Sequence, residues 1–116
     1  MKPDEITAHC LGLAGVAEDH PFGDQPAVYR VGGKIFALLA ETADPPRVSL
    51  KLPPDEVAAL RAEYPDTVLP GYHLNKRHWV TVLLEGDLDA DMIRELVGEA
   101  YDVVVATLPR RLRPVP

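Results

Sequence analysis

The stretch from residue 28 to residue 52 constrains the fold of this 116-residue chain more than any other part of the sequence. Two β-prone runs, 28–31 and 34–40, are separated by Gly32-Gly33, a pattern typical of a hairpin with a tight turn. A third run, 47–52, alternates strictly between polar and apolar residues, which predicts a half-buried strand with one polar face. Because the turns between these strands are short, we expect antiparallel pairing.

The remaining elements place helices before, between and after the strands. Apolar residues at helical spacing predict helices over 4–14, 54–64 and 88–107. A fourth strand is predicted over 78–84 and a short extra strand near 67–69, whereas the Gly- and Pro-rich segment 15–27 is expected to be mostly loop. The order α-β-β-β-α-β-α predicts an α+β fold of two layers, with helices packed on one face of the sheet and the other face open to water.

Length and composition limit the class of protein. A chain of this length forms one domain, 1–116, and we expect residues 113–116 to be a flexible tail. Hydrophobic residues make up 47% and charged residues 26%, which argues against a disordered chain. Cys10 is the single cysteine, so an internal disulfide is excluded and a reducing cytoplasm is favoured. Every apolar run is far shorter than the roughly 18 residues of a membrane span, so no membrane association is expected.

The charges are unevenly distributed along the chain. A net charge of −6 argues against a uniformly basic nucleic-acid-binding domain but leaves room for a local basic face. The predicted sheet is locally basic, and 67–84 contains Lys76 and Arg77 but no acid. Acidic residues step by three or four along the last predicted helix, a pattern that we interpret as a solvated face: Asp87, Asp91, Glu95, Glu99 and Asp102. The sharper alternative is a surface for a divalent cation or a partner, but a linear stripe does not converge on one point.

The predicted open face of the sheet carries the most suggestive side chains. Arg47, Ser49 and Lys51 share one face of their strand, and Trp79 and Thr81 are expected to point to the same side. A Trp among cations on a water-facing sheet suits stacking on bases or docking of a protein. The alternative is a Trp that is covered by a loop or packed on an arginine stem.

The sequence predicts no catalytic residues, no metal site and no cofactor, and therefore no enzyme. His73 and His78 have no third ligand nearby, although zinc needs three or four. Cys10 and His9 are neighbours on a predicted helix and point about 100° apart, so Cys10 is expected to pack in the core. The Gly32-Gly33-Lys34 segment lies in a hairpin and lacks the spacing of a phosphate-binding loop.

Several blocks, in order and spanning nearly the whole chain, resemble the MmcQ/YjbR family of small bacterial proteins. They are Pro21-Phe22-Gly23, the run from Val31 to Leu39, the run from Pro46 to Lys51, Gly71-Tyr72-His73-Leu74-Asn75-Lys76-Arg77-His78-Trp79, and the segment from Tyr101 to Leu112. The resemblance implies a fold of the CyaY/frataxin type, an antiparallel sheet with helices on one side. It also implies DNA binding, since the family is commonly described as predicted DNA-binding with a double-wing motif. A shared fold does not import the iron chemistry of frataxin.

Two hypotheses about function follow. The first is a DNA-binding protein that uses the sheet face, the loop and the tail; the expected contacts are Arg47, Lys51, Tyr72, Asn75, Lys76, Arg77, His78, Trp79, Arg110 and Arg111, with Arg113 beside them. The second is a protein–protein interaction module that uses the same face without catalysis. An enzyme acting on small molecules is a third class, which the lack of a catalytic constellation disfavours. Affinity that falls steeply with salt would favour DNA over a protein partner.

Overall fold

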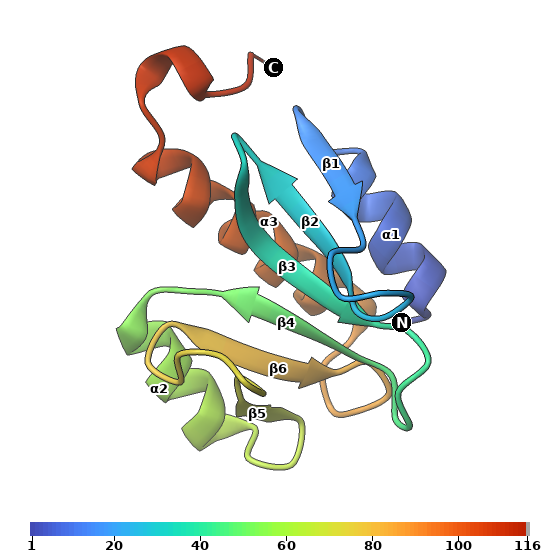
Figure 1. The fold of residues 1–116 in the computed structure, drawn as a ribbon. Coiled ribbons are helices and arrows are strands. Elements are labelled where there is room, and N and C mark those ends of the chain that lie inside the picture. The colour runs from blue at the N-terminus through green and yellow to red at the C-terminus, as the bar shows by residue number, and fades with distance from the viewer. Residues whose placement is uncertain (116) are drawn as a thin grey trace.

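The computed structural model describes residues 1–115 as a six-stranded antiparallel sheet with three α-helices on one face (Figure 1). The strand order is β1-β2-β3-β4-β6-β5. In chain order the elements are α1 (Pro3–Leu11), β1 (Val16–Asp19), β2 (Ala27–Val31), β3 (Lys34–Ala40), β4 (Arg47–Lys51), α2 (Pro54–Glu63), β5 (Val68–Pro70), β6 (Trp79–Leu83), α3 (Ala90–Thr107) and a 3₁₀ turn, η1 (Arg110–Leu112). The predicted two-layer α+β architecture is confirmed, and so is the short strand expected near 67–69, which is β5.

The predicted order omitted one element: the segment 15–27 is mostly loop, as expected, but it contains the edge strand β1 at 16–19. The sequence of β1, Val-Ala-Glu-Asp, shows no apolar alternation because three of its four residues are exposed. Its side chains are instead held by polar contacts. The buried Tyr29 hydroxyl donates a hydrogen bond to Glu18 Oε1 at 2.8 Å and shares another with the Thr7 hydroxyl of α1 at 2.8 Å. Because polar contacts hold this strand, its sequence lacks the alternation of apolar residues by which a strand is usually predicted.

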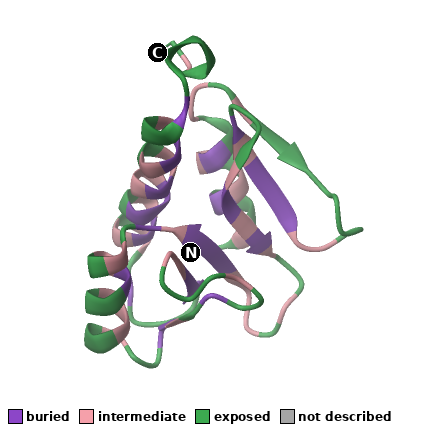
Figure 2. Ribbon diagram, turned by 60° about the vertical axis from the view of Figure 1, so that its left-hand side comes forward, coloured by how far each residue is buried: buried purple, intermediate pink, exposed green. Residues whose placement is uncertain are grey.

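The core lies between the sheet and the helices. One face of each strand contributes apolar side chains, such as Val48 and Leu50 of β4, which are fully buried beneath α3. Cys10 is also fully buried, as expected, and burial raises the pKa of its thiol to about 12. Figure 2 shows buried residues along the sheet and the inner sides of the helices. The side chains of alternate strand residues point away from this core, and they form the face discussed below.

A β-bulge in β3 changes which residues reach each face. Tyr29 pairs with Ala37, but the next residue, Arg30, pairs with Ile35, so Phe36 is the extra residue. Phe36 is fully buried and packs edge-on against the Tyr101 ring of α3, with ring centroids 5.6 Å apart. Ile35 and Leu38 consequently both lie on the face away from the helices.

The long helix begins two residues later than predicted. Asp89 is the N-cap of α3 and its side chain accepts a hydrogen bond from the Met92 amide at 2.8 Å. Asp87, which we expected in the acidic stripe of this helix, lies outside it, and its carboxylate accepts a hydrogen bond from the Thr67 hydroxyl. The stripe therefore consists of Asp91, Glu95, Glu99 and Asp102.

The chain end is held against this helix over part of its length. The guanidinium of Arg113, the first residue of the expected flexible tail, donates to Leu108 O and Ala106 O at 3.0 and 3.2 Å. Pro116 lies outside the described residues.

Within residues 1–115 no helix combines the length and the apolar character that crossing a membrane requires.

The turn between β2 and β3 offers a matched pair of substitutions. Gly32 has φ +56° and a Cβ there would lie 2.5 Å from Leu108 Cδ1, whereas Gly33 has φ +80° with nothing within 4 Å. We expect Gly33→Ala to lower the free energy of unfolding by about 1 kcal/mol, which is the backbone cost of the left-handed conformation. Gly32→Ala should lower it by about 1–3 kcal/mol more, because Leu108 must be displaced. Urea unfolding followed by circular dichroism measures both; equal losses would contradict the close packing of Leu108.

Candidate functional site

The open face of the sheet is hollowed at its centre because small side chains occupy its middle strands. Ser49 of β4 pairs with Thr81 of β6, and their hydroxyl oxygens lie 2.9 Å apart. Both residues are buried although they point away from the helices. Ser49 lines a hollow that is bounded by Leu38 of the neighbouring strand and by Tyr72 and Leu74 of the loop before β6.

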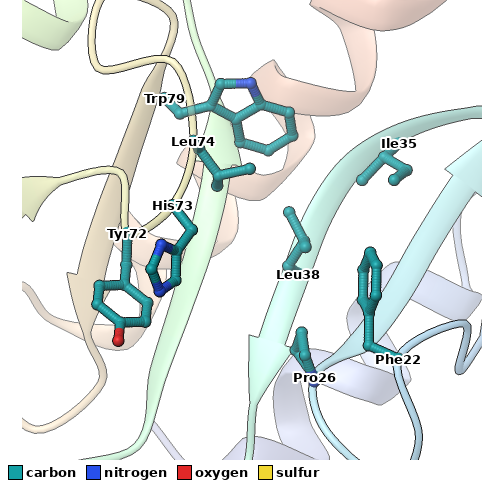
Figure 3. Close-up of a pocket in the computed structure, with 8 residues that line it drawn as sticks. All are labelled: Phe22, Pro26, Ile35, Leu38, Tyr72, His73, Leu74 and Trp79. Carbon is teal, nitrogen blue, oxygen red and sulfur yellow. The ribbon is translucent and has the colours of Figure 1, made fainter.

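Beside the hollow at Ser49 lies an apolar hollow of about 460 Å³, which we call the trough. Figure 3 shows that one wall comes from the segment before β6 and from β6 itself, and that the other comes from β3 and the loop before β2. The eight lining residues are Phe22, Pro26, Ile35, Leu38, Tyr72, His73, Leu74 and Trp79. Phe22 and Tyr72 are 67% and 69% exposed, which is unusual for large apolar side chains gathered around one hollow.

Two further hollows adjoin the trough, and each of them contains a cation. One, of about 290 Å³, shares Leu38, Tyr72 and Leu74 with the trough and extends it to Arg47 and Ser49. The other, of about 460 Å³, shares Trp79 and lies beside Lys51, Asn75 and His78. The apolar trough is thus flanked at both ends by a cation.

The loop from Gly71 to His78 holds its aromatic rings in place through close backbone contacts. A Cβ on Gly71 would lie 2.7 Å from Trp79 Cβ, so only glycine allows the loop to pack this closely. The Tyr72 amide donates to Thr81 Oγ1 at 3.2 Å, which links the loop to the hydroxyl pair. His73 has a left-handed φ of +56°, and its ring packs against that of Tyr72 with centroids 4.1 Å apart. A non-glycine residue in this conformation is strained, a feature that clusters at binding sites.

Two of the predicted contact residues hold this loop together. The Lys76 ammonium donates to Gly71 O at 3.1 Å and to Leu74 O at 3.4 Å. Asn75 Oδ1 accepts from the Arg77 amide at 2.9 Å, and Asn75 O accepts from the His78 and Trp79 amides. The positive charge of Lys76 therefore faces carbonyl oxygens of its own loop, although no acid lies nearby in the sequence.

The structure brings most, but not all, of the predicted site residues together. The register pairs Lys51 with Trp79 and Arg47 with Leu83, so these side chains lie on the face away from Val80 and Leu50, as predicted. Among residues 1–115, Arg47, Lys51 and Arg77 have no carboxylate partner. Arg110 and Arg111 belong to η1, which follows α3 and lies beside the β2–β3 turn (Figure 1). They do not line the trough.

Sequence reasoning predicted only Tyr72 and Trp79 among the eight residues that line the trough. It missed His73 and Leu74 of the same loop and the whole opposite wall, namely Phe22, Pro26, Ile35 and Leu38. A signal for two of them was present: the run from Ile35 to Leu39 is apolar throughout, which is typical of a strand covered on both faces rather than one open to water. Phe22 and Pro26 come from a loop whose path over the sheet no local pattern reveals.

Titratable groups with shifted pKa values lie away from the trough within residues 1–115. Hydrogen bonds from His20 and Tyr29 lower the pKa of Glu18, and the same contact with Glu18 raises the pKa of His20. In that part of the chain no group of three or more His, Cys, Asp or Glu side chains could hold a metal ion. The trough offers aromatic faces, apolar walls and flanking cations, which suit binding of a ligand.

The different contacts of Lys76 and Arg77 can be tested by neutral variants of similar length. Lys76→Met removes the donor to two loop carbonyls, so we expect it to lower the free energy of unfolding by about 1 kcal/mol. Arg77→Met should change it by less than about 0.5 kcal/mol, since that side chain is exposed. Urea unfolding and amide hydrogen exchange of residues 71–79 measure the two effects. Equal stability of the two variants would show that Lys76 does not support the loop.

A pair of carboxyls between α2 and α3 predicts how stability depends on pH. Burial, and then a hydrogen bond with Glu99, raises the pKa of Glu56 to about 7. The folded state therefore binds more protons than the unfolded state between about pH 4.5 and 7, so this group makes stability fall as pH rises through that window. We expect Glu56→Gln to raise the melting temperature at pH 8 and to show no such advantage towards pH 5. Glu95→Gln, an exposed change on α3, is the control; the same pH profile in both variants would contradict the pairing.

The fold and the site define a class: a two-layer α+β protein with an aromatic trough on the helix-free face of its sheet. Residues 11–103 match the sequence profile of the YjbR family. The chain belongs to the YjbR family, as the sequence blocks indicated.

Two relatives and two solved structures that resemble this chain cover between 78% and 97% of it. The uncharacterized protein YjbR of Escherichia coli K12 is 37% identical over 114 residues, which are 97% of this chain and 95% of the relative. The uncharacterized protein YbdF of Escherichia coli O157:H7 is 35% identical over 91 residues, 78% of this chain and 74% of that protein. The crystal structure of Deinococcus radiodurans DR2400 superposes with a TM-score of 0.91 at 37% identity and covers 97% of this chain and 85% of the other. A crystal structure from Pseudomonas syringae gives a TM-score of 0.77 at 29% identity, covering 89% and 98%.

Proposed function

We propose that this chain is a non-catalytic DNA-binding module that receives unpaired bases in the trough. The observation that carries this proposal is the set of three aromatic side chains, Phe22, Tyr72 and Trp79, that surround one apolar hollow. Two of them are about two-thirds exposed. Exposed rings of this kind bind single-stranded nucleic acid by stacking, at about 1–3 kcal/mol per base and with little dependence on sequence.

The flanking cations suit the phosphates of such a strand. Arg47 and Lys51 lie at opposite ends of the trough, and Arg77 stands in the loop beside it. None of the three is paired with a carboxylate in the described part of the chain, so their charge is available to a ligand. Because the walls of the trough are apolar, a duplex that presents only phosphates would bind weakly there. We therefore expect single-stranded DNA to bind more tightly than duplex DNA.

A protein partner is the second candidate, and the aliphatic side chains of the trough favour it. Ile35, Leu38 and Leu74 offer no specific contact to a base, whereas they suit apolar side chains of a peptide. The net charge of −6 also opposes the approach of a polyanion. A protein partner would bind with a weak dependence on salt. DNA binding would weaken with a slope of about −0.7 per phosphate contact in log K against log salt.

The single tryptophan of the chain lines the trough and reports directly on the proposed binding. We expect oligothymidylate to quench Trp79 fluorescence at low salt, because a stacked base covers the indole ring. Trp79→Leu keeps an apolar side chain but removes the large ring, and it should weaken binding by about tenfold, or about 1.4 kcal/mol, measured by fluorescence anisotropy of a labelled oligonucleotide.

Phe22→Ala provides the same test at a side chain that is largely exposed and therefore contributes little to folding. Tyr64→Leu, at the end of α2 on the other side of the sheet, is the control and should leave binding unchanged. If oligothymidylate neither quenches Trp79 nor binds at low salt, the DNA proposal fails and the protein-partner candidate replaces it.

A further inference from the structure

Two basic segments that are far apart in the sequence lie together at one end of the sheet. The Lys34 ammonium at the start of β3 donates to the Thr107 hydroxyl at the end of α3, at 3.2 Å. Gly32 of the β2–β3 turn is so close to Leu108 that a Cβ would lie 2.5 Å from its methyl carbon. Figures 1 and 2 both show the C-terminal turn next to this hairpin. The turn and the segment after α3 therefore form one surface.

This surface, which we call the basic end, consists of Arg30, Lys34, Arg110, Arg111 and Arg113. No acidic residue occurs in 27–40 or in 103–116. Arg30 is paired with Asp19 at 3.4 Å, and the other four have no carboxylate partner among residues 1–115. The net charge of the chain is −6, so these four unpaired cations form a positive patch at one end of an otherwise acidic protein.

The helix dipole explains part of this arrangement but not all of it. Cations near the carboxyl end of a helix are favourable, and Arg113 donates to Ala106 O and Leu108 O in this way. In the described residues the side chains of Arg110 and Arg111 make no hydrogen bond, and both are exposed. Their charge is therefore free for a ligand, while Arg113 fixes the turn that carries them.

The basic end continues from one end of the trough. Ile35 lines the trough and pairs with Arg30 across the sheet, and Lys34 is the preceding residue of β3. Arg30 lies on the same face as Ile35, whereas Lys34 points to the helix side, where it donates to Thr107. A strand that leaves the trough past Ile35 thus reaches Arg30 first, and it must pass the end of the hairpin to reach Lys34 and η1.

We propose that the basic end is a second, sequence-independent phosphate site for the same DNA strand whose bases occupy the trough. This inference rests on the proposed function. In this proposal Arg110 and Arg111 contact only oligonucleotides that are longer than the trough. An oligonucleotide that only fills the trough does not reach them. Affinity and its salt dependence should then both increase with length beyond the trough.

The test compares oligothymidylates of about 5 and about 20 nucleotides, which bracket the site sizes of single-stranded-DNA-binding folds. Anisotropy titrations between about 50 and 200 mM salt give the slope of log K for each. We expect R110S/R111S to reduce the slope for the longer strand by about 0.7 for each phosphate that the variant no longer binds, and to leave the short strand within about twofold of wild type. K2S/R61S removes the same charge from the helix layer and should change neither strand.

The outcomes separate this inference from the proposed function. An unchanged slope for the longer strand in R110S/R111S, with wild-type binding intact, overturns the second site and leaves the trough proposal standing. If R110S/R111S lowers the slope but W79L affects neither strand, the basic end binds DNA and the trough does not. If the wild-type chain binds neither strand, both proposals fail.

Discussion

The hydrogen bond between the Ser49 and Thr81 hydroxyls is the interaction around which the helix-free face is organised. It satisfies two polar groups that are buried on a face we expected to be open to water. Thr81 Oγ1 also accepts the Tyr72 amide, so the loop that carries the aromatic rings is attached at the same point. Ser49 lines the hollow that adjoins the trough, and Thr81 attaches the loop that forms one wall of the trough. An apolar residue in place of Thr81 would leave the Tyr72 amide of the loop without its partner.

Local patterns predicted the parts of the fold that depend on local chemistry. The Gly32-Gly33 turn, the alternation of 47–52 and the common face of Lys51 and Trp79 are all present in the structure. The polar strand β1 was missed because tertiary hydrogen bonds to Tyr29, rather than an apolar period, hold it. The candidate site was predicted only in part. Sequence alone grouped Arg110 and Arg111 with the sheet face and left Lys76 free, because neither the path of η1 nor the carbonyls around an ammonium can be read from spacing.

Charge is separated between the two layers of the molecule. The helix layer carries the acidic stripe of α3 and Glu56, whose pKa is raised by burial and by the neighbouring Glu99. Arg47 and Lys51 lie on the helix-free face and the basic end lies at the β2–β3 hairpin, although the helix layer also carries Lys2, Arg61 and Arg94. A polyanion would therefore be attracted in one orientation and repelled in the opposite one, so the field of the protein would orient a ligand before contact.

The bulge at Phe36 gives β3 a property that a regular strand lacks. In an uninterrupted strand a one-residue insertion or deletion exchanges the faces of every side chain beyond it. Here the extra residue has already been absorbed, so Phe36 and Ala37 both face the helices while Ile35 and Leu38 both face the trough. The core contact of Phe36 with Tyr101 is consequently separate from the two side chains that shape the trough. Substitutions at Ile35 and Leu38 can therefore alter the lining of the trough without changing the core contact of Phe36.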